Sequence, residues 1–274
     1  MNSAKSKPTI DEILAAIEKG QRLGIDEALM LVAASKKMLD RSGVEQFFET
    51  ARAAARTRQA WQRLDIEVID LNKTPLAELE AHLQASDADR VFLQFPPTFP
   101  AKTLFATVEH VAQHVSVGAF KPQDILDRSA AFSMKVAEFC RQLAQAGLSF
   151  SSGRFNAHKF GTDRIDEIFS VMMQLAKAKI KVSASLPMSF SEEAKVLHLA
   201  KLREFHDRTQ AIDFVVLDLD AKFSDRELLR TVALTRLMLD NIDTISLADY
   251  DLSQEKKLDT DLLRQCVETG LNLS

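Results

Sequence analysis

The sequence is poor in the residues and patterns that mark secreted, membrane-spanning or loosely linked chains. It holds two cysteines, Cys140 and Cys266, which lie too far apart to form a local metal or redox motif. Eight glycines and seven prolines are too few for long flexible linkers. No apolar run approaches the roughly 20 residues that span a bilayer, and the first residues lack the apolar core of a secretory signal. These absences predict a cytoplasmic protein with no membrane segment.

Charge and length narrow the class of protein further. The formal net charge is −4, so no basic surplus suggests nucleic-acid binding. Hydrophobic residues make up 46% of the 274 positions, which is ample for one large core. That length is normal for a single α/β barrel.

Short apolar segments alternate with helix-length segments from residue 66 onward. Short and mostly apolar strands are typical of a sheet that is covered on both faces. The strand candidates are Ile66–Leu71, Arg90–Phe95, Val115–Phe120, Leu148–Ser151, Ile180–Leu186, Asp213–Leu219 and Thr244–Leu247. The helix candidates between them are Pro75–Ala85, Lys102–His114, Phe132–Ala146, Thr162–Lys179, Glu192–Arg208 and Arg226–Asn241.

This alternation predicts parallel β/α units, because no hairpin signals join the strands. Right-handed crossovers would wind the units into a TIM-like (β/α) barrel, closed or partial. We assign residues 62–274 to the barrel domain. Residues 1–61 contain three helix patterns, and we expect them to form a helical N-terminal extension packed on the barrel.

The helix candidate near the C-terminus has the clearest pattern. Ser224 and Glu227 form a capping-box sequence at its start. An apolar stripe at helical spacing then predicts one buried face; its members are Leu229, Val232, Ala233 and Leu237. Arg236 and Asp240 lie four residues apart and are expected to pair on this helix.

Several phrases of the sequence follow one another as they do in one enzyme family. They include Arg90–Gln94, Val117–Phe120, Leu197–Glu204 and, above all, the run Leu228–Ile242. In this order they resemble radical S-adenosylmethionine (SAM) enzymes of the futalosine pathway to menaquinone, aminofutalosine synthase and dehypoxanthine futalosine cyclase. The resemblance covers nearly the whole chain and implies a barrel of the radical SAM type.

The resemblance breaks where the family's chemistry resides. Radical SAM enzymes hold a 4Fe–4S cluster with three thiolates, usually in a C-x-x-x-C-x-x-C motif after the first strand. Between positions 61 and 75 this sequence has no cysteine and no room for that loop. The family's Gly-rich segment after the fourth strand is replaced by Ser151–Ala157, and its Gly-His pair after the fifth strand is missing. We therefore expect neither a 4Fe–4S cluster nor SAM as a cofactor.

Two groups of residues are candidates for ligand binding at the carboxyl ends of the strands, where barrel enzymes place their sites. Ser152, Arg154, Asn156 and His158 could hold an anion, although the same loop could instead plug an empty pocket. Asp218 and Asp220 alternate along one strand and could bind a cation or act as acid and base. The more frequent role of such acids is to solvate a strand end and precede the helix cap. No catalytic residue is assigned.

Histidine and phenylalanine patterns give weaker indications. His110 and His114 lie one helical turn apart and could contribute to a zinc site, but no third ligand or H-E-x-x-H pattern accompanies them. No metal site is therefore assigned. Six phenylalanines in the barrel segment are more often core or plug than a stacking surface. They are Phe95, Phe99, Phe105, Phe150, Phe155 and Phe160.

The sequence leaves two functional hypotheses. The first is a pseudoenzyme that lacks the cluster and serves menaquinone biosynthesis as a binding or partner protein. Its partner would be a catalytic paralogue or a second copy of the chain. The second is an enzyme that performs metal-independent chemistry at a rebuilt barrel mouth through Arg154, His158, Asp218 and Asp220.

Overall fold

The computed structural model describes residues 7–37, 41–56, 66–153, 165–219, 222–247 and 260–271. They form two compact units, and the chain passes between the units more than once. The first unit takes its described residues from Met1–Trp61, Leu186–Asp207 and Leu217–Leu273. The second takes them from Gln62–Ser185 and Arg208–Val216. The predicted boundary between residues 61 and 62 stays a prediction.

Seven strands form one sheet in the same order as in the sequence. The strands are β1 (Ile66–Asp70), β2 (Arg90–Gln94), β3 (Ser116–Ala119), β4 (Leu148–Gly153), β5 (Lys181–Pro187), β6 (Ile212–Asp218) and β7 (Thr244–Leu247). Pairing is parallel from β1 through β5. Parallel strands in sequential order are typical of consecutive β/α units. The predicted α/β class is confirmed, and each predicted strand overlaps an observed one.

Helices follow the strands along the chain and also precede the first of them. No helix among the described residues is long and apolar enough to cross a membrane. The helices are α1 (Ile10–Glu18), α2 (Ile25–Lys37), α3 (Arg41–Arg56), α4 (Leu76–Ala85), α5 (Ala101–Ala112), α6 (Pro122–Ala131), α7 (Val136–Gln145), α8 (Ile165–Lys177), α9 (Glu192–Thr209), α10 (Asp225–Met238) and α11 (Thr260–Glu268).

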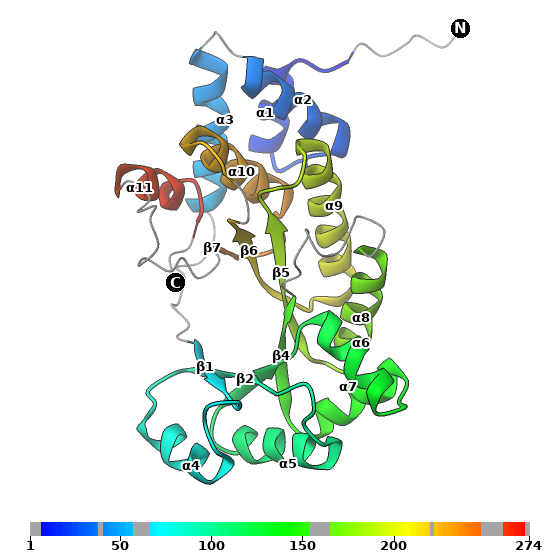
Figure 1. The fold of residues 1–274 in the computed structure, drawn as a ribbon. Helices are drawn as coiled ribbons and strands as arrows, with labels where there is room; N and C mark the ends of the chain where they lie inside the picture. Colours follow the sequence, from blue (N-terminus) through cyan, green and yellow to red (C-terminus); the bar gives the residue numbers. More distant parts are fainter. Residues whose placement is uncertain are drawn as a thin grey trace, which may run out of the picture. The chain divides into compact units, whose positions relative to one another are not determined.

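In the second unit, helices α5, α6 and α7 pack against strands β3 and β4 (Figure 1). Apolar side chains of these elements form its core; Phe139 and Leu143 of α7 are completely buried. Gly118 in β3 is required by close packing, because a Cβ at this position would lie 2.2 Å from the Phe150 ring of β4. The pairing of β3 with β4 also shifts register at Val117 and Gly118, which is typical of a β-bulge.

In the first unit, α10 lies beside α3, α2 and α11 (Figure 1). The predicted stripe is only part of its buried surface, because every residue from Arg230 to Met238 is buried. Leu229, which was expected to be buried, is half-exposed. Helices of the N-terminal segment and α11 cover sides of α10 that an amphipathic helix would leave to solvent.

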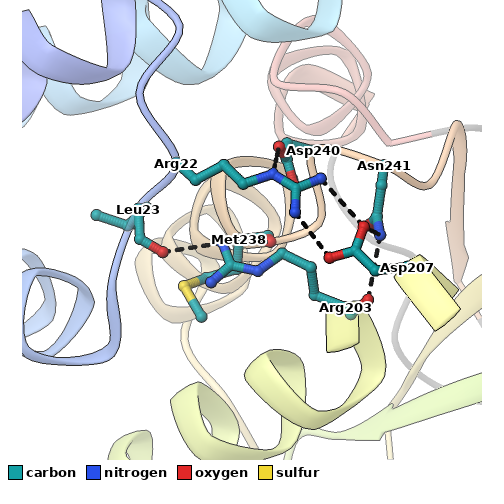
Figure 2. Close-up of polar contacts among 7 residues, drawn as sticks. All are labelled: Arg22, Leu23, Arg203, Asp207, Met238, Asp240 and Asn241. Carbon is teal, nitrogen blue, oxygen red and sulfur yellow. Dashed lines mark hydrogen bonds and ion pairs between the residues drawn. The ribbon is translucent and has the colours of Figure 1, made fainter. Parts of the chain in front are cut away.

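A polar network joins the connection between α1 and α2 to the ends of α9 and α10 (Figure 2). The Arg22 guanidinium donates to Asp207 Oδ2 at 2.7 Å and to Asp240 Oδ2 at 2.7 Å. Asn241 Nδ2 donates to Asp207 Oδ1 at 2.8 Å, and Arg203 Nη1 donates to the Leu23 carbonyl oxygen at 2.9 Å. Asp240 lies beyond the end of α10 at Met238, so it is not on one helix with Arg236 as predicted.

We predict that this network makes a modest contribution to the free energy of unfolding, and that the contribution depends on pH. Hydrogen bonding from Arg22 lowers the pKa of the Asp207 carboxyl. A lowered carboxyl pKa stabilises the fold above the ordinary value of 3.8, and that contribution is lost as the pH falls through the folded-state pKa. Arg22→Ala should cost about 1 kcal/mol at pH 7, because these side chains are largely solvated. Urea melts at pH 7 and at acid pH should show the cost shrinking toward the acid side.

A double-mutant cycle with Asp207→Asn controls for effects outside the pair. The double variant should cost less than the sum of the two single variants. Strict additivity would contradict the pairing of Arg22 with Asp207.

Candidate functional site

Two of the six predicted ligand-binding residues lie in the described part of the chain. Ser152 is half-buried in β4, and its backbone N–H donates to the Phe120 carbonyl oxygen at 3.1 Å. Asp218 is half-buried at the end of β6, and its carbonyl oxygen accepts from the Met188 N–H at 2.9 Å. Arg154, Asn156, His158 and Asp220 lie outside the described residues. Their grouping into a binding site stays a prediction.

A pocket of about 450 Å³ lies at the carboxyl ends of β2 and β3 in the second unit. It is thus on the edge of the sheet where sites of (β/α) folds occur. Its wall comes from the end of β2, the residues after β3 and one face of α6. The lining residues are Phe92, Leu93, Gln94, Phe95, Pro97, Phe120, Lys121, Asp124, Asp127, Arg128 and Ala131.

Phe120 holds a strained backbone conformation at the wall of this pocket. Its φ of 64° lies in the left-handed region, which is costly for a bulky side chain. The Ser151 hydroxyl donates to the Phe120 carbonyl oxygen at 3.0 Å, in addition to the Ser152 N–H. The Phe120 ring stacks on Phe95 with ring centroids 5.2 Å apart and an interplanar angle of 17°. The two hydrogen bonds from β4 therefore hold the backbone of Phe120, and the stack on Phe95 holds its ring.

Arg128 of α6 is the buried charge of the pocket, with 7% of its surface exposed. Its Nη2 donates to the carbonyl oxygens of Phe95 at 3.0 Å and Pro96 at 2.7 Å. Its Nη1 is buried and has no hydrogen-bond partner among the described residues. Burial lowers the pKa of Arg128, while the charge of Asp124 acts in the opposite direction. The guanidinium carbon lies 5.2 Å from the Phe120 ring centroid, within cation–π range.

The exposed rim of the pocket carries one more cation and two carboxylates. Asp124 Oδ2 accepts from the Lys121 backbone N–H at 2.9 Å at the start of α6. Asp127 Oδ1 accepts from the Gln123 side-chain amide at 2.6 Å. Both acids are therefore already engaged with groups of their own helix. Lys121 is exposed beside them.

Neither Arg128 nor Phe120 was predicted from the sequence as a site residue. One signal for Arg128 was available, because Ile125, Arg128 and Ser129 follow at i, i+3 and i+4 and so share one helix face. All three are buried. Recognising this face required a helix over 122–131, which was not predicted. Nothing in the sequence indicates a left-handed Phe120, since glycine is the usual residue there.

A second group of buried charges lies in the first unit, at the first turns of α9 and α10. Lys195 Nζ is 3.7 Å from Glu227 Oε1, and Arg230 Nη2 donates to Glu192 Oε1 at 3.0 Å. Each of these buried cations therefore has a carboxylate close by. For Arg128, by contrast, no carboxylate within ion-pair distance is found in the described ranges.

The cysteines do not fit an iron–sulfur cluster. A radical SAM cluster needs three thiolates, and the sequence has two cysteines. Cys140 in α7 and Cys266 in α11 are completely buried and belong to different units. Burial raises the pKa of the Cys140 thiol to about 11 and that of the Cys266 thiol to about 12. The loop 71–75 between β1 and α4, where the family motif would stand, is short.

The histidine pair does not complete a metal site within the described ranges. The rings of His110 and His114 are 5.2 Å apart, but α5 ends at Ala112, so His114 lies past the helix. No group of three or more His, Cys, Asp or Glu residues is placed to hold a metal ion in the part of the chain that the structure describes.

Comparison with known proteins places the fold. No protein-family model matches the chain, and no curated protein sequence matches it. The solved FeFe-hydrogenase maturase HydG from Carboxydothermus hydrogenoformans is similar, with a TM-score of 0.67 and 13% identity, over 96% of this chain and 69% of that chain. A second HydG structure gives a TM-score of 0.66 at 11% identity, over 96% of this chain and 67% of that one.

This likeness defines the class of fold. The chain has a TIM-like α/β fold, which it shares with the maturase HydG. At such low identity the comparison extends to the fold alone.

Proposed function

We propose that this chain is a pseudoenzyme of radical SAM fold, which holds no 4Fe–4S cluster and acts as a binding or partner protein. The observation that supports this proposal most strongly is the number and the burial of the cysteines in the chain. With two cysteines, both buried in helices and both with raised pKa values, the chain offers no three thiolates at one place. Without the cluster, SAM loses the iron that anchors its methionine part, and we expect no SAM binding at physiological levels.

The pathway in which the protein acts is proposed from the resemblance to the futalosine enzymes. Leu228–Ile242, the run most similar to that family, forms the centre of the first unit as helix α10 and the turn after it. We propose a role in menaquinone biosynthesis, beside a catalytic paralogue or as a self-associating protein in the cytoplasm. A gene position among futalosine-pathway genes would support this assignment.

A binding role is also supported by the pocket at the ends of β2 and β3. A volume of about 450 Å³ lies in the range of small-molecule sites, about 300–1,000 Å³. The alternative hypothesis of metal-independent catalysis relies on Arg154, His158 and Asp220, which lie outside the described residues. Asp218, its remaining residue, gives no catalytic arrangement by itself.

Iron reconstitution tests the proposed function directly. After anaerobic treatment with iron and sulfide, we expect far less than one 4Fe–4S cluster per chain, because three thiolates are required. Iron and sulfide assays together with electron paramagnetic resonance of the reduced protein measure this. A signal near one cluster per chain that disappears in Cys140→Ser or Cys266→Ser would overturn the proposal.

A further inference from the structure

We propose that the pocket at the ends of β2 and β3 binds a small monocarboxylate with a planar apolar body. The carboxylate would face Arg128, and the planar body would lie against Phe92 and Phe95. This inference rests on the proposed function, since a chain without a radical cofactor would use the pocket for binding.

The charge of Arg128 is the first argument. A buried guanidinium with no carboxylate within ion-pair distance is costly, because burial removes it from water and the more distant charge of Asp124 offsets only part of that cost. Lys195 and Arg230, which are buried to a similar degree, each lie near a carboxylate of the chain. Within the described ranges, the acceptors of Arg128 are the carbonyl oxygens of Phe95 and Pro96. A carboxylate from outside would supply the missing charge.

The free donor of Arg128 is the second argument. Its Nη2 already makes two hydrogen bonds, whereas Nη1 makes none in the described part of the chain. Guanidinium groups bind carboxylates through hydrogen bonds that are shorter and stronger than those between neutral groups. Because Nη1 is closed to water, a ligand reaches it only after a side chain of the pocket wall rotates. Such rotamer changes are common on binding.

The rim limits the charge of the ligand. Asp124 and Asp127 line the same pocket and would repel a second or third negative charge. Lys121 offsets only one of them. A monocarboxylate brings a single charge, which Arg128 can neutralise, so it meets the least repulsion from these acids. Citrate and nucleotide polyphosphates carry too much negative charge for this rim.

The aromatic wall limits the shape of the ligand. Phe92 and Phe95 are half-exposed, and both line the pocket. Aromatic rings that are partly exposed favour a planar partner in an offset-stacked or edge-to-face arrangement. The stack of Phe95 on Phe120 extends this wall inward, and the strained backbone of Phe120 is held by Ser151 and Ser152. Such over-determined strain is typical of functional sites.

Calorimetric titration with 1-naphthoate, 1-naphthamide and citrate tests the inference. The first two compounds have the same ring, but the amide carries no charge. For the unmodified protein we expect 1-naphthoate to bind at least tenfold more tightly than 1-naphthamide, and citrate not to bind. Equal affinity for the acid and the amide, or no binding of 1-naphthoate at millimolar concentration, would overturn the inference without any variant.

Two variants locate the site. Arg128→Met keeps an unbranched side chain but removes the guanidinium and its charge, and it should weaken 1-naphthoate binding at least tenfold. Arg141→Met, on the neighbouring helix α7, removes an exposed arginine that pairs with Glu138, and should leave binding unchanged. If Arg128→Met fails to fold, Phe95→Leu serves instead and should weaken both naphthalene compounds. Unchanged binding in the variant that folds would refute the assignment.

The binding experiment and the iron-reconstitution experiment can contradict the inference and the proposed function independently of each other. A protein that assembles no cluster but ignores 1-naphthoate would contradict the ligand and leave the proposed function intact. A protein that assembles a cluster and still binds 1-naphthoate through Arg128 would contradict the proposed function alone.

Discussion

Leu237→Ala is expected to lower the free energy of unfolding by roughly 2–5 kcal/mol, because it removes buried methyl groups and leaves a cavity. Leu237 is 4% exposed on α10, at the centre of the first unit. Helices α2, α3 and α11 pack on α10 and cannot all close the space together. Chemical denaturation followed by circular dichroism measures the loss.

The matched control is Leu197→Ala on α9, which makes the same chemical change at a side chain that is 44% exposed. It should cost below about 1 kcal/mol, as surface substitutions usually do. Equal losses for the two variants would show that α10 is rotated from the register described for it.

Arg236→Met is expected to have an effect of similar or larger size, roughly 3–6 kcal/mol. The guanidinium donates to the carbonyl oxygens of Ile242 at 3.0 Å, Asp243 at 3.1 Å and Gly270 at 2.7 Å. Buried hydrogen bonds from a charged donor contribute about 1.5–3 kcal/mol each, and partial hydration of the freed carbonyls offsets part of the loss. In the variant, the connection into β7 and the end of α11 would lose the guanidinium that holds both of them.

Arg226→Met on the same helix controls for the loss of an arginine as such, because Arg226 is exposed. Its cost should stay within about 0.5 kcal/mol. Hydrogen exchange should also show faster exchange at residues 242–247 and 266–271 in Arg236→Met alone. Normal protection of both segments in that variant would argue against the anchor.

The strands were predictable because buried parallel strands have a simple signature. Each is a short apolar run between helix-length segments, and this pattern can be recognised without any knowledge of tertiary contacts. Helices were harder where the chain turns tightly. The segment 132–146 was predicted as one helix, but Ser133 has a φ of 54° and α7 begins at Val136. Helix α6 was not predicted, although Pro122 stands in its first turn, where proline is favoured.

The pocket could not be predicted from the sequence, and the reason is a different one. Its features depend on a backbone angle at Phe120 and on an arginine that bonds carbonyl oxygens some thirty positions away. Local patterns do not encode either. The predicted site residues came from the alternation at strand ends and from the resemblance. Of the two that lie in the described residues, Ser152 contacts Phe120. The arginines of α10 show the same limit, since a helical stripe cannot indicate that Arg230 and Arg236 are also buried.

The two buried thiols have a practical consequence for following the motions of the chain. At pH 8 a thiol with a pKa of about 11 is ionised in roughly one molecule in a thousand, so native Cys140 and Cys266 should react very slowly with thiol reagents. Modification then waits for local opening. Cys140 belongs to the second unit and Cys266 to the first, so the labelling rate of each thiol reports how often its own unit opens. Peptide-resolved labelling rates would report the opening free energies of the two units separately, in one unmodified chain.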